Sequence, residues 1–203
     1  MPAKNHDLHG SVPEKSPVAL MIVDVINDLE FEGGDALLAN ALPAAWRLAQ
    51  LAARAREAGI AVIYVNDNFG KWRSDFRALL EHCRNENVKG REIAEILAPE
   101  KSDYFVLKPK HSGFFSTTLD TLLEYLHVRT IILAGLTTDR CVLFTAADAH
   151  MRDLRIIVPE DCSAADSEQH HTDAMRMIAR ILGADTTPSD ELDLTSLQES
   201  ARE

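Results

Sequence analysis

Five short apolar runs, rich in valine and isoleucine, recur along the chain and are separated by segments with helical spacing. The runs lie at residues 18–23, 60–65, 104–107, 130–134 and 155–158. Each run is continuous rather than alternating, which is typical of strands buried on both faces of a parallel sheet. Strands that alternate with helices build right-handed βαβ units. The pattern therefore predicts an α/β fold, a three-layer α/β/α sandwich around a mostly parallel sheet.

The segments between these runs carry apolar residues at helical spacing. Helices are expected at 43–58, at 116–127, from residue 138 or 139 onward, and at 167–182. Pro43 suits the first turn of its helix, and Gly59 suits the position after its end. Residues 184–187 carry a weak signal for an edge strand. We therefore expect about six strands, in the order 3-2-1-4-5-6.

Length and charge narrow the classes of function. The 203 residues suit one domain, expected at 17–203 after a polar N-terminal tail at 1–16. Lys and Arg number 21 against 32 Asp and Glu, and the formal charge of -11 disfavours nucleic acid and anionic membranes as partners. No apolar run approaches the length that spans a membrane. Three cysteines without close pairing argue against a disulfide framework and favour a reducing, cytoplasmic setting.

A cysteine stands at a chemically favourable place after the fourth run. Residues 135–142 read GLTTDRCV, which places Cys141 in the first turn of a helix beyond a buried strand. Free amide N–H groups and the positive end of the helix dipole favour a thiolate there, so a lowered pKa is expected. A lone cysteine is more often an inert buried residue. The location nevertheless favours a nucleophile.

Two more reactive side chains stand at ends of predicted strands. Asp24 follows the first run and Lys108 ends the third. Ligands of open parallel sheets bind outside the carboxyl ends of the strands, where Asp24, Lys108 and Cys141 would meet. Each residue alone is more often a turn cap or a solvated charge. Together they predict a nucleophilic set, in which Asp24 takes the thiol proton and Lys108 favours the ionised forms.

Three motifs in this order resemble a known group of enzymes. Residues 19–28 read ALMIVDVIND, residues 107–114 read LKPKHSGF, and GLTTDRCV at 135–142 is followed by Thr145 and Ala146. Over residues 17–192 the chain resembles the isochorismatase-like cysteine hydrolase superfamily. The resemblance covers nearly the whole chain.

The resemblance implies specific roles for these residues. Cys141 would be the nucleophile, Asp24 the general base and acid, and Lys108 the third member of the triad. A cis peptide bond between Leu136 and Thr137 is implied, with the Thr137 and Cys141 N–H groups as oxyanion hole. The resemblance also implies a small-molecule substrate, no organic cofactor, and a homo-oligomer (a dimer or tetramer) in which a partner subunit often completes the pocket.

Two departures from the family pattern refine the predicted chemistry. Members resembling isochorismatase proper cleave a vinyl ether and often lack the cysteine, so Cys141 favours an amide or ureide C–N bond and a thioester intermediate. Nicotinamidase-like members carry an Asp-x-His metal signature where residues 66–69 read NDNF, so no metal is expected. Two alternatives stay open: a vinyl-ether or metal-assisted hydrolase on this fold, and a non-catalytic thiol sensor or binding protein.

The long connection from residue 66 to residue 103 is expected to shape the pocket, because long insertions at strand ends often do so. It holds two amphipathic stretches, around 76–83 and 93–97. The expected substrate contacts in and near it are Asn66, Phe69, Trp72, Arg73 and Phe114. Arg73 suits bidentate binding of a carboxylate, although this segment equally suits a lid against a neighbouring subunit. Phe114 and Phe115 suit the pocket wall, but a core role is favoured for one of them. Carbamoyl amino acids, ureidoacrylate-like ureides, maleamate-like amides and biuret-like compounds all remain open as substrates.

Overall fold

The computed structural model describes residues 15–68, 75–85 and 87–201. The strands are β1 (Val18–Val23), β2 (Ala61–Asp67), β3 (Tyr104–Lys108), β4 (Thr130–Leu136), β5 (Arg155–Ile157) and β6 (Ser163–Ala164). The helices are α1 (Gly34–Glu57), α2 (Phe76–Asn85), α3 (Arg91–Ile96), α4 (Leu119–Leu126), α5 (Leu143–His150), α6 (Glu168–Leu182) and α7 (Leu194–Ser200). A π-helical turn (Thr138–Val142) precedes α5, and a 3₁₀ turn (Ser189–Glu191) precedes α7.

The strands form one parallel sheet in the order β3-β2-β1-β4-β5, which confirms the predicted order of the first five. The sixth strand differs from the expectation. Where an edge strand was expected at 184–187, Asp185 makes a single bridge to Ile157. The sixth strand is instead β6, which pairs with the end of β4. Because β5 stops at Ile157, the last residues of β4 are left for β6 to pair with.

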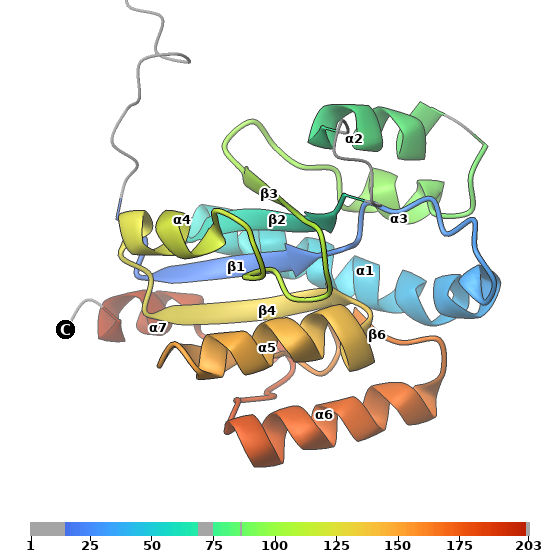
Figure 1. The fold of residues 1–203 in the computed structure, drawn as a ribbon. Helices are drawn as coiled ribbons and strands as arrows, with labels where there is room; N and C mark the ends of the chain where they lie inside the picture. Colours follow the sequence, from blue (N-terminus) through green and yellow to red (C-terminus); the bar gives the residue numbers. More distant parts are fainter. Residues whose placement is uncertain (1–14, 69–74, 86, 202–203) are drawn as a thin grey trace, which may run out of the picture.

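Alternate residues of β1 belong to two separate hydrophobic cores, as expected for a strand buried on both faces. Val18, Leu20 and Ile22 pack with the buried residues of α1 and α3. Ala19, Met21 and Val23 pack with those of α4, α5 and α6. Figure 1 shows β1, β2 and β4 running alongside one another between these helices. The predicted three-layer α/β/α sandwich is therefore confirmed.

The predicted start of the first helix is wrong. Helix α1 begins at Gly34, and Pro43 lies inside it rather than in its first turn. Leu37 and Ala41 precede the proline and are buried against the sheet, so their packing outweighs the loss of one intrahelical hydrogen bond. The predicted end is confirmed, since Gly59 follows the last turn with a positive φ of 71°.

The other helices lie close to their predicted positions. Ser167 caps α6, the long connection holds α2 and α3, and the turn that carries Cys141 is π-helical before it continues as α5.

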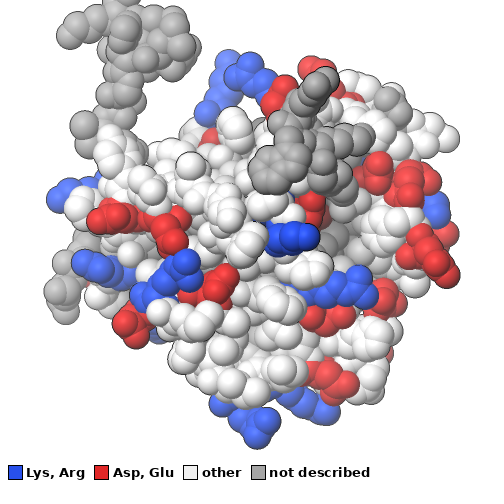
Figure 2. All heavy atoms as spheres, in the orientation of Figure 1, with Lys and Arg blue, Asp and Glu red and all other residues white. Residues whose placement is uncertain are grey.

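None of the helices in the described ranges is long and apolar enough to cross a membrane. Figure 2 shows acidic and basic side chains interspersed on one face of the molecule, with no broad basic surface on that face.

Candidate active site

Three reactive side chains meet at the carboxyl ends of β1, β3 and β4. Lys108 Nζ lies 2.7 Å from Asp24 Oδ2 and 3.4 Å from Cys141 Sγ. Its third hydrogen bond goes to the backbone oxygen of Lys110, at 3.1 Å. An ammonium group has three N–H donors. The structure therefore brings together the three residues that the strand ends predicted, with the lysine between the carboxylate and the thiol.

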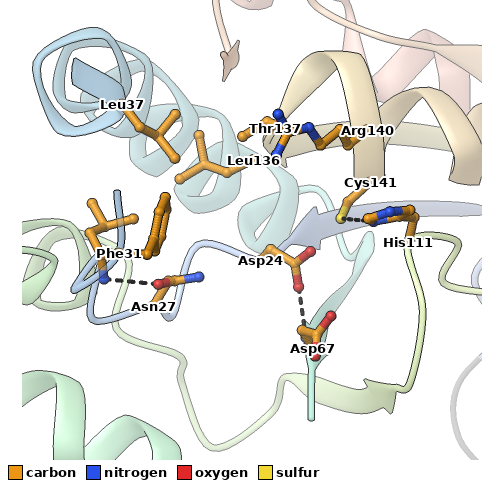
Figure 3. Close-up of a pocket in the computed structure, with 11 residues that line it drawn as sticks. Asp24, Asn27, Phe31, Leu37, Asp67, His111, Leu136, Thr137, Arg140 and Cys141 are labelled. Atoms are coloured by element: carbon orange, nitrogen blue, oxygen red, sulfur yellow. Dashed lines mark hydrogen bonds between the residues drawn. The ribbon is translucent and has the colours of Figure 1, made fainter. Parts of the chain in front are cut away.

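Asp24 is fixed by its backbone as well as by Lys108. It adopts the left-handed conformation with φ of 51°, which aspartate tolerates better than most residues. Its N–H donates to Val65 O at 3.0 Å, and its Oδ1 accepts the N–H of Asp67 at 2.6 Å (Figure 3). Burial raises the pKa of Asp24, and the nearby Lys108 offsets part of this rise. Asp24 is thus a stronger base than an exposed carboxylate.

Lys108 is fully buried, yet its pKa is raised, which favours the ammonium form. Burial lowers its pKa, but attraction to the Asp24 carboxylate and interaction with Cys141 outweigh burial, and the pKa is raised overall. A second carboxylate oxygen, Asp67 Oδ2, lies 3.7 Å from Lys108 Nζ. Lys108 can therefore balance negative charge on either Asp24 or Cys141 without releasing a proton of its own.

The pKa of Cys141 is raised, contrary to the lowered pKa that its position at a helix start predicted. Burial, followed by the neighbouring Asp24 carboxylate, raises the pKa of Cys141 to about 12, although Lys108 acts in the opposite direction. The predicted lowering of the pKa was wrong because burial, the largest cause of the shift, disfavours the charged thiolate. Beyond the three-residue group, His111 Nδ1 lies 3.7 Å from Cys141 Sγ. Transfer of the thiol proton to Asp24 would leave the net charge of the group unchanged.

The turn before Cys141 has an unusual backbone. The peptide bond between Leu136 and Thr137 is cis, as the family resemblance implies. Gly135 has a φ of 122°, and a Cβ atom there would lie 2.1 Å from the backbone oxygen of Val23. The backbone at this position therefore requires glycine. Thr138, which follows the two residues joined by the cis bond, is fully buried, and its Oγ1 lies 2.8 Å from Nδ1 of His171 on α6. Helix α6 thereby supports the turn from behind.

A cavity of about 240 Å³ opens beside two of the three reactive residues, Asp24 and Cys141 (Figure 3). Its lining combines an apolar group of side chains with charged and amide groups. The lining residues are Asp24, Asn27, Leu29, Phe31, Leu37, Asp67, His111, Leu136, Thr137, Arg140 and Cys141. A cavity of this size with few convergent polar groups suits a small molecule.

The predicted substrate contacts fall in three different places. Asn66 is fully buried and donates to Ile26 O at 2.8 Å, so it holds the segment after β1 and does not line the pocket. Phe114 is buried in the core beneath the guanidinium of Arg152, which lies 4.4 Å from the ring centroid, and it is not a lining residue either. Phe69, Trp72 and Arg73 lie outside the described residues.

Several lining residues were not predicted as substrate contacts from the sequence. Asp67 ends a strand, as Lys108 does, so the rule that located Lys108 could have located it. Arg140 directly precedes Cys141, and this adjacency in the sequence was the one indication that it lies near the site. Phe31 and Leu37 come from the segment before and at the start of α1, and only the folded structure places them at the pocket.

No group of three His, Cys, Asp or Glu side chains within the described ranges could hold a metal ion. The expectation that the protein binds no metal rests on the sequence of residues 66–69 and stays a prediction. Cys83 and Cys162, expected to be structural, are both buried and free of disulfides.

The family model for the Isochorismatase domain matches residues 18–191. The chain belongs to the isochorismatase family. Its relatives include the uncharacterized isochorismatase family protein YaaI of Bacillus subtilis, which is 39% identical over 178 residues, 88% of this chain and 97% of YaaI. A ureidoacrylate amidohydrolase, RutB of Methylorubrum extorquens, is 30% identical over 172 residues, 71% of this chain and 68% of RutB.

A solved structure has the same fold. The crystal structure of N-carbamoylsarcosine amidase from Thermoplasma acidophilum superimposes with a TM-score of 0.66 and 31% identity, over 87% of this chain and 98% of that one. Two of these three similar proteins are thus named as an amidohydrolase and an amidase.

Proposed function

We propose that this isochorismatase family protein is a cysteine amidohydrolase, which hydrolyses a C–N bond of a small amide or ureide through a thioester on Cys141. The observation that carries the proposal is the position of Lys108 Nζ, 2.7 Å from Asp24 Oδ2 and 3.4 Å from Cys141 Sγ. This contact assembles a nucleophile, a base and a fixed positive charge at one edge of the cavity. The names of two similar proteins support the same bond type.

The first half of the reaction forms the thioester. Asp24 accepts the proton from the Cys141 thiol as the sulfur attacks the carbonyl carbon. The backbone N–H groups of Thr137 and Cys141 stabilise the oxyanion of the tetrahedral intermediate. Asp24 then gives the proton to the leaving nitrogen, the C–N bond breaks, and ammonia or an amine departs.

The second half of the reaction releases the acid. A water molecule gives a proton to Asp24 and its oxygen attacks the thioester carbonyl. The C–S bond breaks, and the sulfur of Cys141 takes back the proton from Asp24. The balance is one amide and one water consumed, with one carboxylic acid (or carbamic acid from a ureide) and one amine produced.

Lys108 is a fixed charge in this scheme and exchanges no proton. The negative charge moves from Asp24 to the sulfur and to the oxyanion during the reaction, and Lys108 remains within reach of both side chains. A buried cation needs no reorganisation to stabilise these forms. The raised pKa of the thiol is compatible with this route, because Cys141 loses its proton only as it attacks.

The proposal is tested by measuring ammonia or amine release from a panel of small primary amides, ureides and biuret-like compounds. Wild-type protein should turn over at least one of them, and Cys141→Ala should lower kcat/KM by at least about 10³-fold. Cys83→Ala is the matched control, since it removes a buried thiol outside the site. Turnover retained in Cys141→Ala and abolished by a chelator would favour the metal-assisted alternative. An absence of turnover across the panel would favour the thiol sensor.

The cytoplasmic location and the homo-oligomer are also part of this proposal. A dimer or tetramer, as the family resemblance implies, would be measured by multi-angle light scattering of the purified chain.

A further inference from the structure

Arg140 combines two positions that matter for a ligand. It directly precedes Cys141 in the sequence, and its side chain lines the same cavity. The side chain is 59% exposed, so the guanidinium remains hydrated and open to a ligand. An arginine beside a nucleophile either belongs to a surface ion pair or binds the substrate. Its distances to the acidic residues around it distinguish these two roles.

Among the described residues, Asp139 and Asp166 have carboxylates near Arg140, and both are too far away to form a close ion pair with it. Nε lies 3.8 Å from Asp139 Oδ2, and Nη2 lies 4.0 Å from Asp166 Oδ2. Charge-assisted N–H···O bonds are about 2.7–2.9 Å long. Asp166 has a closer partner in His170, whose Nδ1 lies 2.5 Å from Asp166 Oδ1. The guanidinium fork of Arg140 is therefore not taken up by either acid.

Charge is also distributed unevenly in the cavity. In Figure 3, Arg140 and Thr137 lie on one side of the pocket, Asp67 lies on the opposite side, and Asp24 lies between them. Asp67 stays close to Asp24 and Lys108, since its N–H donates to Asp24 Oδ1 and its Oδ2 lies 3.7 Å from Lys108 Nζ. The guanidinium of Arg140 thus lies beside Thr137, on the side of the pocket away from Asp67.

We propose that Arg140 binds a carboxylate of the substrate, so that the protein selects small amides or ureides that carry an acid group near the scissile carbonyl. This inference rests on the proposed function, because it assigns the substrate class of the same site. Arginine suits the role since its planar fork can make two parallel hydrogen bonds to a carboxylate. A hydrogen bond to a charged group is worth about 1.5–3 kcal/mol, which corresponds to about 10- to 150-fold in binding.

The first test uses two alkylating reagents of similar size. Iodoacetate carries a carboxylate and iodoacetamide is neutral, and both label a thiol. Labelling rates at Cys141 are measured at alkaline pH by peptide mass in wild type, Arg140→Gln and Arg140→Lys. The ratio of the iodoacetate rate to the iodoacetamide rate should fall about tenfold in Arg140→Gln and less in Arg140→Lys, which keeps the charge.

The matched control is Arg176→Gln, which removes the same charge from the exposed surface of α6, where Arg176 pairs with Asp173. This control should leave the ratio at its wild-type value. An Arg140→Gln ratio equal to that of the wild type would overturn the inference.

The second test compares succinamate with butyramide, in which a methyl group replaces the carboxylate. Arg140→Gln should lower kcat/KM for succinamate at least about tenfold and change that for butyramide less than about twofold. Equal losses on both amides, or a wild type that prefers butyramide, would overturn the inference and leave the proposed function standing. Failure of the proposed function gives a different result, in which neither amide nor any member of the wider panel is turned over and the labelling ratio alone decides the role of Arg140.

Discussion

Lys108 Nζ and Asp24 Oδ2 are 2.7 Å apart at the carboxyl edge of the sheet, and the lysine side chain is fully buried. The sheet places them there, since β1 and β3 flank β2 and end at the same edge. Two opposite charges away from water stabilise each other, but either one alone would be left without compensation. The stability and the reactivity of the site therefore depend on this pair and on the thiol beside it.

Replacing Lys108 by methionine should destabilise the fold by about 3 kcal/mol, because the buried Asp24 would lose its counter-charge. The double variant Asp24→Asn with Lys108→Met should recover part of this loss, since neither charge then remains. Urea unfolding followed by circular dichroism measures both. A Lys108→Met variant as stable as the wild type would contradict the buried pair.

The pH dependence of activity should show the raised pKa of Asp24. Asp24 accepts a proton only as a carboxylate, and burial favours its neutral form. Activity should therefore be lost as the pH falls through a value above the ordinary carboxyl pKa of about 3.9. The profile of kcat/KM for an accepted amide measures this limb. A limb at or below the ordinary value would show that Asp24 is not desolvated.

Activity and thiol reactivity should separate in Asp24→Asn. The Asp24 carboxylate raises the pKa of Cys141, so its removal should increase the thiolate fraction and speed labelling by iodoacetamide, while amide hydrolysis is lost. One unit of pKa changes that fraction about tenfold. Lys108→Met should act in the opposite direction, because the ammonium lowers the pKa of Cys141.

Labelling rates against pH, read by peptide mass, provide the measurement for both variants. Cys83 and Cys162 are internal controls, because both are buried and burial raises the pKa of each to about 12. Slower labelling of Cys141 in Asp24→Asn than in the wild type would contradict the proposed electrostatics.

Gly135→Ala should disrupt the end of β4, because a Cβ atom there would lie 2.1 Å from Val23 O. The expected loss exceeds about 3 kcal/mol, since the contact is with backbone that cannot move aside. Gly59→Ala is the matched control: its φ is also positive, but nothing lies within 4 Å of the added atom. That variant should lose only about 1 kcal/mol. Thermal unfolding of the two variants should therefore differ clearly.

Most of the fold could be predicted from the sequence because continuous apolar runs allow few other structures. The start of α1 could not, since Pro43 suggests a helix start while Leu37 and Ala41 owe their helical positions to packing on the sheet. The sixth strand was missed because Ser163 and Ala164 carry no strand pattern. They pair with the last residues of β4, which extend beyond the end of β5.

The candidate site was predicted in part, for a physical reason. Strand ends locate Asp24 and Lys108 because the chain direction fixes which edge they occupy. The direction of the Cys141 pKa shift was predicted incorrectly, since burial depends on packing that the sequence does not state. Phe31 and Leu37 reach the pocket through the path of the segment that leads into α1, which no local pattern encodes.

An acyl group carried by Cys141 during turnover would be the direct sign of the proposed thioester. Wild-type protein would be mixed with an accepted amide, quenched in acid within the first turnovers, and digested for peptide mass spectrometry. We expect a Cys141 peptide heavier by the acyl group, which hydroxylamine removes and which Cys141→Ala lacks. Continued turnover by Cys141→Ala, with no acylated peptide from the wild type, would contradict the thioester mechanism.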